Sequence, residues 1–246
     1  KERETMRIYD KIAKQDTDRK VITVAFLGDS VTQGCFEIYK TGENSIETVY
    51  SYKDAFSIRF REILNTLYPD MQVNIINAGA SGDNSTSGLQ RMDKDILAYR
   101  PDLVVISYGL NDAMAGQDGI AVYADNLRDM FRKAKQCECD VIYLTQNYMN
   151  TEVSKHLQDV YIVRLAESFA SVQNGKRLKS YFESGKKVAE ESGVMTCDGY
   201  AVWEKMESAG VKVTELLANK LNHPIKEYHT YIAIKLIEKI LGIANI

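Results

Sequence analysis

Five short runs of β-branched and other apolar residues alternate with longer amphipathic stretches along this chain. Strands are predicted over Val21–Gly28, Gln72–Ala78, Leu103–Tyr108, Val141–Gln146 and Val194–Cys197. Strands that alternate with helices form βαβ units, in which the strands lie in one parallel sheet and the helices cover it. The alternation therefore predicts an α/β fold with a mainly parallel, five-stranded sheet.

The stretches between the strands carry apolar residues at helical spacing. Helices are predicted over Tyr52–Tyr68, Ser85–Tyr99, Val122–Lys135 and Ile232–Leu241. The long segment Ser154–Ser192 is also compatible with a helix, and Asn174-Gly175 is expected to break it in two. The stretch Phe36–Ser51 has neither a helical nor a strand period, which predicts an inserted loop near the end of the first strand.

Length and charge restrict the class of protein. The chain has 246 residues, of which 45% are hydrophobic, so a single domain over residues 1–246 is expected, with a short N-terminal extension of about residues 1–19. The formal net charge of −3 gives no support for a nucleic-acid groove. No apolar run approaches the roughly 20 residues that a membrane helix needs, so no membrane span is expected. The oligomeric state stays open.

The cysteines and the N-terminus bear on the compartment. Cys137 and Cys139 stand too close together for a usual zinc knuckle, and with Cys35 and Cys197 they are expected to be free thiols. Free thiols favour a reducing, cytoplasmic location. Secretion stays open, because the sequence starts without methionine and a signal peptide is removable.

Small and polar residues follow three of the predicted strands. They are Gly28-Asp29-Ser30, Asn77-Ala78-Gly79 and Asn111-Asp112. Ligands of open parallel sheets bind beyond the carboxyl ends of the strands, where a serine is placed as a nucleophile would be. Glycine there allows close approach of the backbone, and asparagine supplies an amide donor. Each motif alone also fits a helix cap or a tight turn.

Four blocks resemble the SGNH or GDSL-type serine hydrolases, and together they span almost the whole chain. The blocks are Gly28-Asp29-Ser30, Asn77-Ala78-Gly79, Gly109-Leu110-Asn111-Asp112 and His223-Pro224, in the order and spacing of that family. The stretch Arg100–Ile106 also looks like the family's approach to its third strand. The resemblance implies a three-layer α/β/α sandwich of the flavodoxin-like type and carboxylic ester hydrolysis without a cofactor.

The same resemblance implies a role for each block. Ser30 is the nucleophile, and His223 is the general base and then the general acid. The oxyanion hole consists of the backbone N–H groups of Ser30 and Gly79 with the side-chain amide of Asn111. The chemistry agrees, since a serine hydroxyl needs a base to take its proton and the developing oxyanion needs preorganised donors.

The other two histidines fit structural roles. His156 lies in a polar stretch and is expected at the surface. His229 resembles the family's helix-start position after the catalytic histidine. Pro224 stiffens the loop of His223, which is therefore the predicted base.

One position departs from the family's pattern. The family usually has an aspartate three residues before the histidine, where this chain has Lys220. That aspartate orients the imidazole and stabilises the imidazolium. We therefore expect a dyad of Ser30 and His223 whose ring is held by a backbone carbonyl of the same loop. Asp198 and Glu215 are distant candidates for a third member, although they equally fit a helix cap and a solvated helix face.

Two further carboxylates flank the predicted site. Asp29 is a possible supporting residue, and Asp112 lies beside Asn111. Carboxylates next to turns usually stabilise those turns, and no histidine pair completes a transition-metal set. No metal is therefore expected.

The substrate is constrained less than the reaction. The stretches Phe36–Ser51 and Gln146–Asn150 bring Tyr39, Tyr50 and several amides to the expected rim, where they suit a sugar. The family includes carbohydrate O-acetyl esterases, so a short-acyl ester of a small molecule or saccharide is expected. The alternatives are a lysophospholipase or thioesterase for longer acyl chains, and a carbohydrate-binding domain without catalysis.

Overall fold

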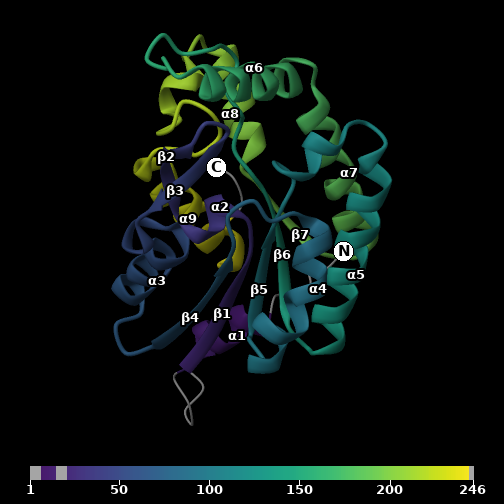
Figure 1. Ribbon diagram of the computed structural model, residues 1–246. Coiled ribbons are helices and arrows are strands. Elements are labelled where there is room, and N and C mark those ends of the chain that lie inside the picture. The colour runs from purple at the N-terminus through teal and green to yellow at the C-terminus, as the bar shows by residue number, and fades with distance from the viewer. Residues whose placement is uncertain (1–6, 15–20, 244–246) are drawn as a thin grey trace.

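A computed structural model describes residues 7–14 and 21–243, and it contains the predicted parallel sheet (Figure 1). The strands are β1 (Val21–Gly28), β4 (Gln72–Gly79), β5 (Leu103–Ser107), β6 (Asp140–Thr145) and β7 (Met195–Asp198). They lie side by side in the order β4-β1-β5-β6-β7, and every pairing is parallel. All five predicted strands are confirmed, each within one residue of its expected ends.

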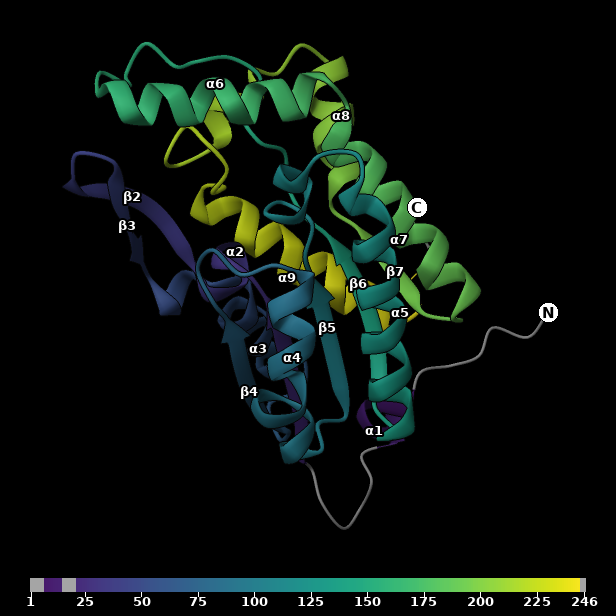
Figure 2. The same ribbon diagram turned by 45° about the vertical axis from the view of Figure 1, so that its right-hand side comes forward.

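Helices cover both faces of this sheet, which confirms the three-layer α/β/α sandwich (Figures 1 and 2). On one side α3 (Phe56–Leu67) packs against α9 (Lys226–Ile240), and on the other α5 (Gly119–Gln136) packs against α4 (Ser85–Asp95) and α7 (Arg177–Glu191). Because both faces are covered, the central strands are apolar throughout, and Leu103 to Ile106 are at most 1% exposed.

The long helical segment divides where the sequence predicts. The helix α6 (Val160–Asn174) ends at Gly175, and α7 begins two residues later. The helix α9 begins at Lys226, earlier than expected, and α8 (Tyr200–Ser208) follows β7 without having been predicted. None of the helices within the described ranges is long and apolar enough to cross a membrane.

The expectation of a loop over Phe36–Ser51 is wrong. This stretch lies in an antiparallel hairpin of β2 (Cys35–Gly42) and β3 (Ser45–Tyr50), which projects from the sheet beside the carboxyl ends of the strands (Figure 2). Most of its residues are exposed or half-buried on both faces. The alternation that normally reveals a strand is therefore absent from its sequence.

The N-terminal helix α1 (Arg7–Lys14) packs at the opposite end of the sheet. Ile8 and Ile12 are fully buried, and the Ile8 N–H donates to Asp140 Oδ2 at 2.7 Å. Lys11 pairs with Asp102, which precedes β5. The other residues of the extension expected over 1–19 lie outside the described residues.

The register of the sheet brings three strand ends to one level. Gly28 at the end of β1 is paired with Gly79 of β4 on one side and with Ser107 of β5 on the other. From β1 the chain passes to β4 on one side of β1 and then crosses to β5 on its other side. Ligands of doubly wound sheets bind at such a topological switch point. Residues that follow these three strands therefore meet at one edge.

Candidate active site

Ser30 is the first residue of α2 (Ser30–Gln33), a single turn directly after β1. The Asp29 side chain caps this turn by accepting the Val31 N–H at 3.0 Å, and Gly34 ends it in the left-handed conformation at φ 95°. The apolar strand β1 and the tight turn α2 together hold the Ser30 side chain at the carboxyl ends of the strands.

His223 meets Ser30 although 193 residues separate them in the chain. Its Nε2 lies 2.9 Å from Ser30 Oγ, and the histidine is 3% exposed. Burial lowers the pKa of His223 to about 4, and an interaction with the Phe36 backbone opposes this only in part. The ring is therefore neutral at pH 7 and free to accept the serine proton.

The carbonyl of the same loop that was expected to hold the His223 ring is not found. Within the described part of the chain, His223 Nδ1 is buried and makes no hydrogen bond of normal geometry, and the ring interacts only with the backbone of Phe36, outside that loop. The carbonyls of the same loop are used elsewhere: that of His223 accepts the Ala218 N–H, that of Asn222 accepts Asn147 Nδ2, and that of Leu221 accepts the Asn150 N–H, each at 2.7 Å.

Neither carboxylate considered as a third member bonds to His223. Asp198 Oδ1 accepts hydrogen bonds from Thr145 Oγ1 at 2.7 Å and the Ala201 N–H at 3.1 Å, and its other oxygen pairs with Lys186. It thus fixes the start of α8. The half-exposed Glu215 carboxylate lies 3.1 Å from Lys220 Nζ.

Asp29 supports the site through the backbone and not through His223. Its Oδ2 accepts Gln146 Nε2 at 2.8 Å, and Gln146 Oε1 in turn accepts the Leu110 N–H at 3.0 Å. This chain ties the ends of β1 and β6 to the segment after β5. Asp29 has no exposed surface, and burial raises its pKa to about 7.

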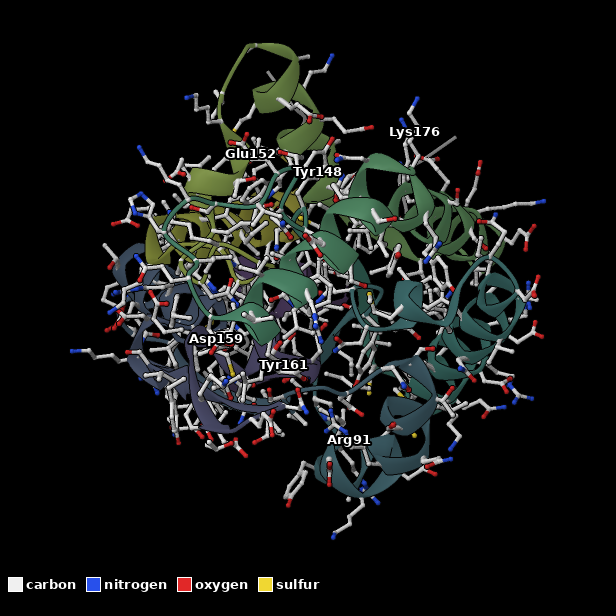
Figure 3. The ribbon with its side chains drawn as sticks, turned by 45° about the horizontal axis from the view of Figure 1, so that its top comes forward. Arg91, Tyr148, Glu152, Asp159, Tyr161 and Lys176 are labelled. Carbon is white, nitrogen blue, oxygen red and sulfur yellow. The ribbon has the colours of Figure 1, made fainter. Side chains whose placement is uncertain are left out.

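Asn111 lies at the same edge, after β5. Its Nδ2 donates to the Asp83 carbonyl at 2.7 Å, which uses one of the two amide hydrogens and fixes the direction of the other. Asp83 is itself held by Arg91 Nε at 2.7 Å and by the Tyr108 hydroxyl at 2.9 Å. Arg91 lies on α4 (Figure 3).

The structure corrects the expectation that the Gly79 N–H is an available oxyanion donor. That N–H already donates to Asn77 Oδ1 at 3.0 Å. A Cβ added at Gly79 would lie 2.1 Å from the Gln33 backbone nitrogen, so Gly79 is there to let β4 approach α2.

Gly82, three residues later, has the open surroundings and the available backbone N–H that Gly79 lacks. It is exposed, has a left-handed φ of 77°, and a Cβ there would meet no atom within 4 Å. Its N–H makes no hydrogen bond to any described residue. Gly82-Asp83 indicates a turn in the sequence, but that signal does not distinguish Gly82 from Gly79 in the same turn-rich stretch.

His229 is a core residue, in line with its expected structural role. Its Nδ1 accepts the Phe56 N–H at 3.2 Å, and its ring packs on Phe36 and Phe56 with centroids 4.8 and 5.8 Å away. Burial lowers its pKa to about 3. His156 is exposed, as predicted.

The two buried histidines make stability depend on pH. Their folded pKa values lie below the unfolded value of about 6.5, so the unfolded chain binds more protons, and their contribution is present above pH 6.5 and lost towards pH 4. His229→Asn keeps an acceptor for the Phe56 N–H but does not titrate. The difference in unfolding free energy between wild type and variant should shrink by about 1.4 kcal/mol per pH unit below 6.5.

Urea unfolding between pH 4.5 and 7.5 measures that difference. Asp29 titrates in both proteins, so its contribution cancels in the comparison. A difference that is constant with pH would show that the pKa of His229 is the same in the folded and unfolded states.

No metal centre or disulfide is found among the residues that the structure describes. No three histidine, cysteine, aspartate or glutamate side chains in the described ranges come close enough together to hold an ion. All four cysteines are free, and only Cys137 is exposed.

The hairpin β2–β3 and the helix α6 form the rim of the candidate active site. Lys40 of β2 pairs with Asp159, which caps α6, at 2.8 Å, and Asp159 lies beside the hairpin in Figure 3. Tyr39, Tyr50 and Tyr52 are 43 to 57% exposed, and the last two stack with centroids 5.5 Å apart.

The amides expected at the rim are buried instead. Gln146, Asn147 and Asn150 are at most 4% exposed, and they bond to backbone groups of neighbouring loops or to Asp29. Their role is to hold the loops together, so the tyrosines of the hairpin are the exposed part of the predicted sugar-binding surface.

Known proteins share parts of this sequence and its fold. Acetylxylan esterase from Geobacillus stearothermophilus is 26% identical over 133 residues, and esterase TesA from Pseudomonas aeruginosa is 30% identical over 127 residues. These matches cover 50 and 51% of this chain, and the chain spans only 59% of the length of each relative.

Solved structures match over more of the chain. A catalytic mutant of the Geobacillus stearothermophilus acetylxylan esterase has a TM-score of 0.65 at 20% identity, covering 89% of this chain and 94% of its own. A lipase/acylhydrolase from Enterococcus faecalis has a TM-score of 0.66 at 20% identity, covering 90% of this chain and 96% of its own. At this identity the likeness establishes the fold alone.

The sequence also matches a protein family over most of its length. The matched residues, 26–229, include Ser30, His223 and the strand ends that surround them. This chain belongs to the GDSL-like lipase/acylhydrolase family.

Proposed function

We propose that this protein is a serine esterase that removes short acyl groups, acetyl above all, from a saccharide through an acyl-serine intermediate. The observation that carries the proposal is the 2.9 Å contact between Ser30 Oγ and a buried, neutral His223. A hydroxyl in contact with a base of this kind is an activated nucleophile.

In the proposed reaction Ser30 Oγ attacks the ester carbonyl carbon while its proton moves to His223 Nε2. The resulting oxyanion accepts hydrogen bonds from the Ser30 N–H, the Gly82 N–H and the second amide hydrogen of Asn111. When the intermediate collapses, His223 gives the proton to the departing alkoxide. Water then attacks the acyl-serine, with His223 taking its proton and returning it to Ser30 as the carboxylic acid leaves.

The exposed tyrosines near the hairpin support a saccharide substrate. Tyr50 and Tyr52 stack with centroids 5.5 Å apart and are 43 and 57% exposed, and sugars pack against exposed aromatic side chains. The similarity to an acetylxylan esterase agrees with this choice.

A second candidate is a thioesterase or lysophospholipase acting on longer acyl chains. The lipases from which the matched family takes part of its name favour it. The two candidates differ in the length of the acyl group and share the same chemistry.

The test compares acetyl and octanoyl p-nitrophenyl esters and acetylated xylo-oligosaccharides as substrates. We expect kcat/KM to be highest for acetyl esters, with acetate released from the oligosaccharide. Higher kcat/KM for octanoate would establish the second candidate. Binding of the oligosaccharide without any ester cleavage would show a carbohydrate-binding domain instead.

The pH profile of the proposed activity follows from the burial of His223. The base must be neutral in the free enzyme, and its pKa is about 4. The acid limb of kcat/KM should therefore lie near pH 4 and not near the ordinary histidine value of about 6.5. Stopped-time assays of wild type and Asp29→Asn between pH 3.5 and 8 measure the limb. Because the pKa of Asp29 is about 7, a midpoint near 6.5 would mean that His223 is solvated only if both proteins show it.

A further inference from the structure

We infer that Asn219 positions His223 by holding the loop that carries the histidine. The inference rests on the proposed function, in which His223 is the base. Asn219 is 4% exposed and lies four residues before His223. The position usually occupied by a carboxylate is Lys220, whose ammonium pairs with Glu215 and leaves the histidine without a charged partner.

The Asn219 side-chain oxygen accepts three successive backbone N–H groups. Leu221, Asn222 and His223 each donate to Oδ1 at 3.0 Å. Convergence of three amides on one oxygen requires a tight turn, and Lys220 provides it with a left-handed φ of 59°. Oδ1 therefore fixes the peptide group from which the His223 side chain projects.

The amide nitrogen of Asn219 fixes the orientation of the Asn219 side chain. Nδ2 donates to Asn222 Oδ1 at 3.1 Å, while the Asn222 carbonyl accepts Asn147 Nδ2 at 2.7 Å. The ends of the loop are joined by an antiparallel bridge between Leu217 and Pro224. The backbone of the loop is thus held by Asn219, which belongs to the loop, and by Asn147, which lies in the segment after β6.

This arrangement matters because, among the described residues, His223 Nδ1 makes no hydrogen bond of normal geometry and the Phe36 backbone opposes the effect of burial on the ring only in part. The distance from Nε2 to Ser30 Oγ is then set by the position of the loop. Removal of the Asn219 amide leaves three N–H groups in a buried loop without their acceptor, and the loop must move to satisfy them. A shift of about 1 Å at a catalytic group costs about 100-fold in rate.

Asn219→Ala should therefore lower kcat by about 10- to 100-fold. KM should stay within about twofold, because the buried Asn219 side chain bonds only to the loop and the lost interaction concerns the chemical step. Asp102→Ala is the control, since the Asp102 side chain also accepts a backbone N–H, from Thr23 at 2.7 Å, but lies before β5 at the opposite end of the sheet. It should leave kcat unchanged.

Asn219→Asp separates a positioning role from general loss of structure. Its carboxylate still accepts the three N–H groups, and the Asn222 amide can turn to donate to it. We expect kcat within about fivefold of wild type, a recovery that general loss of packing at this position does not allow. The added negative charge also raises the pKa of His223, so the acid limb of kcat/KM moves to higher pH.

The kinetic constants and pH profiles of the three variants decide the matter, measured well below each midpoint of thermal unfolding. Unchanged kcat in Asn219→Ala, equal losses in Asn219→Ala and Asp102→Ala, or no recovery in Asn219→Asp would each overturn the inference.

A second readout separates this inference from the proposed function. Diisopropyl fluorophosphate reacts with an activated serine without any need for the natural substrate. If wild type cleaves no ester but Ser30 is phosphorylated with release of fluoride, and more slowly in Asn219→Ala, the proposed function fails and the positioning role stands. Equal labelling of both proteins would overturn the positioning role.

Discussion

Ser30→Ala should abolish ester hydrolysis, with kcat reduced by about 10⁴-fold or more. The side-chain oxygen that forms the acyl bond is removed, and the remaining groups at the site only bind and polarise the ester. His223→Ala should cost a similar factor, since the serine then keeps its proton. Because the two residues act as one unit through the 2.9 Å contact, the double variant should be no slower than either single variant.

Turnover of p-nitrophenyl acetate by purified, folded protein measures these losses. His156→Ala is the control, since the same substitution at an exposed histidine should leave the rate unchanged. Additive losses in the double variant would contradict a cooperating pair, and retained turnover in Ser30→Ala would assign the activity to another nucleophile.

Gly79→Ala should damage both activity and stability, although Gly79 touches no reacting atom in the proposed mechanism. The new Cβ would lie 2.1 Å from the Gln33 nitrogen and 2.6 Å from the Thr32 carbonyl carbon, and neither backbone atom can rotate away. The turn α2 must shift, and Ser30 moves with it. We expect a loss of about 100-fold in kcat from misplacement and about 1–3 kcal/mol in unfolding free energy from overpacking.

Kinetics at saturating ester together with urea unfolding measure both effects. Gly210→Ala is the matched control, since a Cβ there meets no atom within 4 Å and only the left-handed φ of 85° is strained. That strain costs about 1–2 kcal/mol and should leave kcat unchanged. Wild-type kcat in Gly79→Ala would mean that β4 does not set the position of the nucleophile.

The sequence could predict the sheet because its central strands are short, largely apolar and buried on both faces. A segment such as Leu103–Ser107 has a composition that only a central strand accommodates. The same reasoning failed for the hairpin β2–β3, because its residues are largely solvated and carry no burial pattern. Where packing does not select residues, the sequence contains no periodic signal.

The residues of the site also divide into those that the sequence identifies and those that only the structure distinguishes. Ser30, Asn111 and His223 were identified from their motifs, and the structure brings Ser30 and His223 together. The choice between Gly79 and Gly82 was beyond the sequence, since both are glycines in one turn-rich stretch. Only the hydrogen bond from the Gly79 N–H to Asn77 and the open surroundings of Gly82 distinguish them.

The sequence by itself determined the order of strands and helices, the nucleophile motif and the absence of an aspartate before His223. Those properties are local, because propensity, periodicity and motif spacing act over a few residues. Only the tertiary structure decided what holds His223. Its backbone N–H donates to Asn219 Oδ1, and the carbonyls of the same loop accept N–H groups from segments that meet the loop in space. Hydrogen bonds in a buried loop must all be satisfied together, and a linear pattern does not encode how that is achieved.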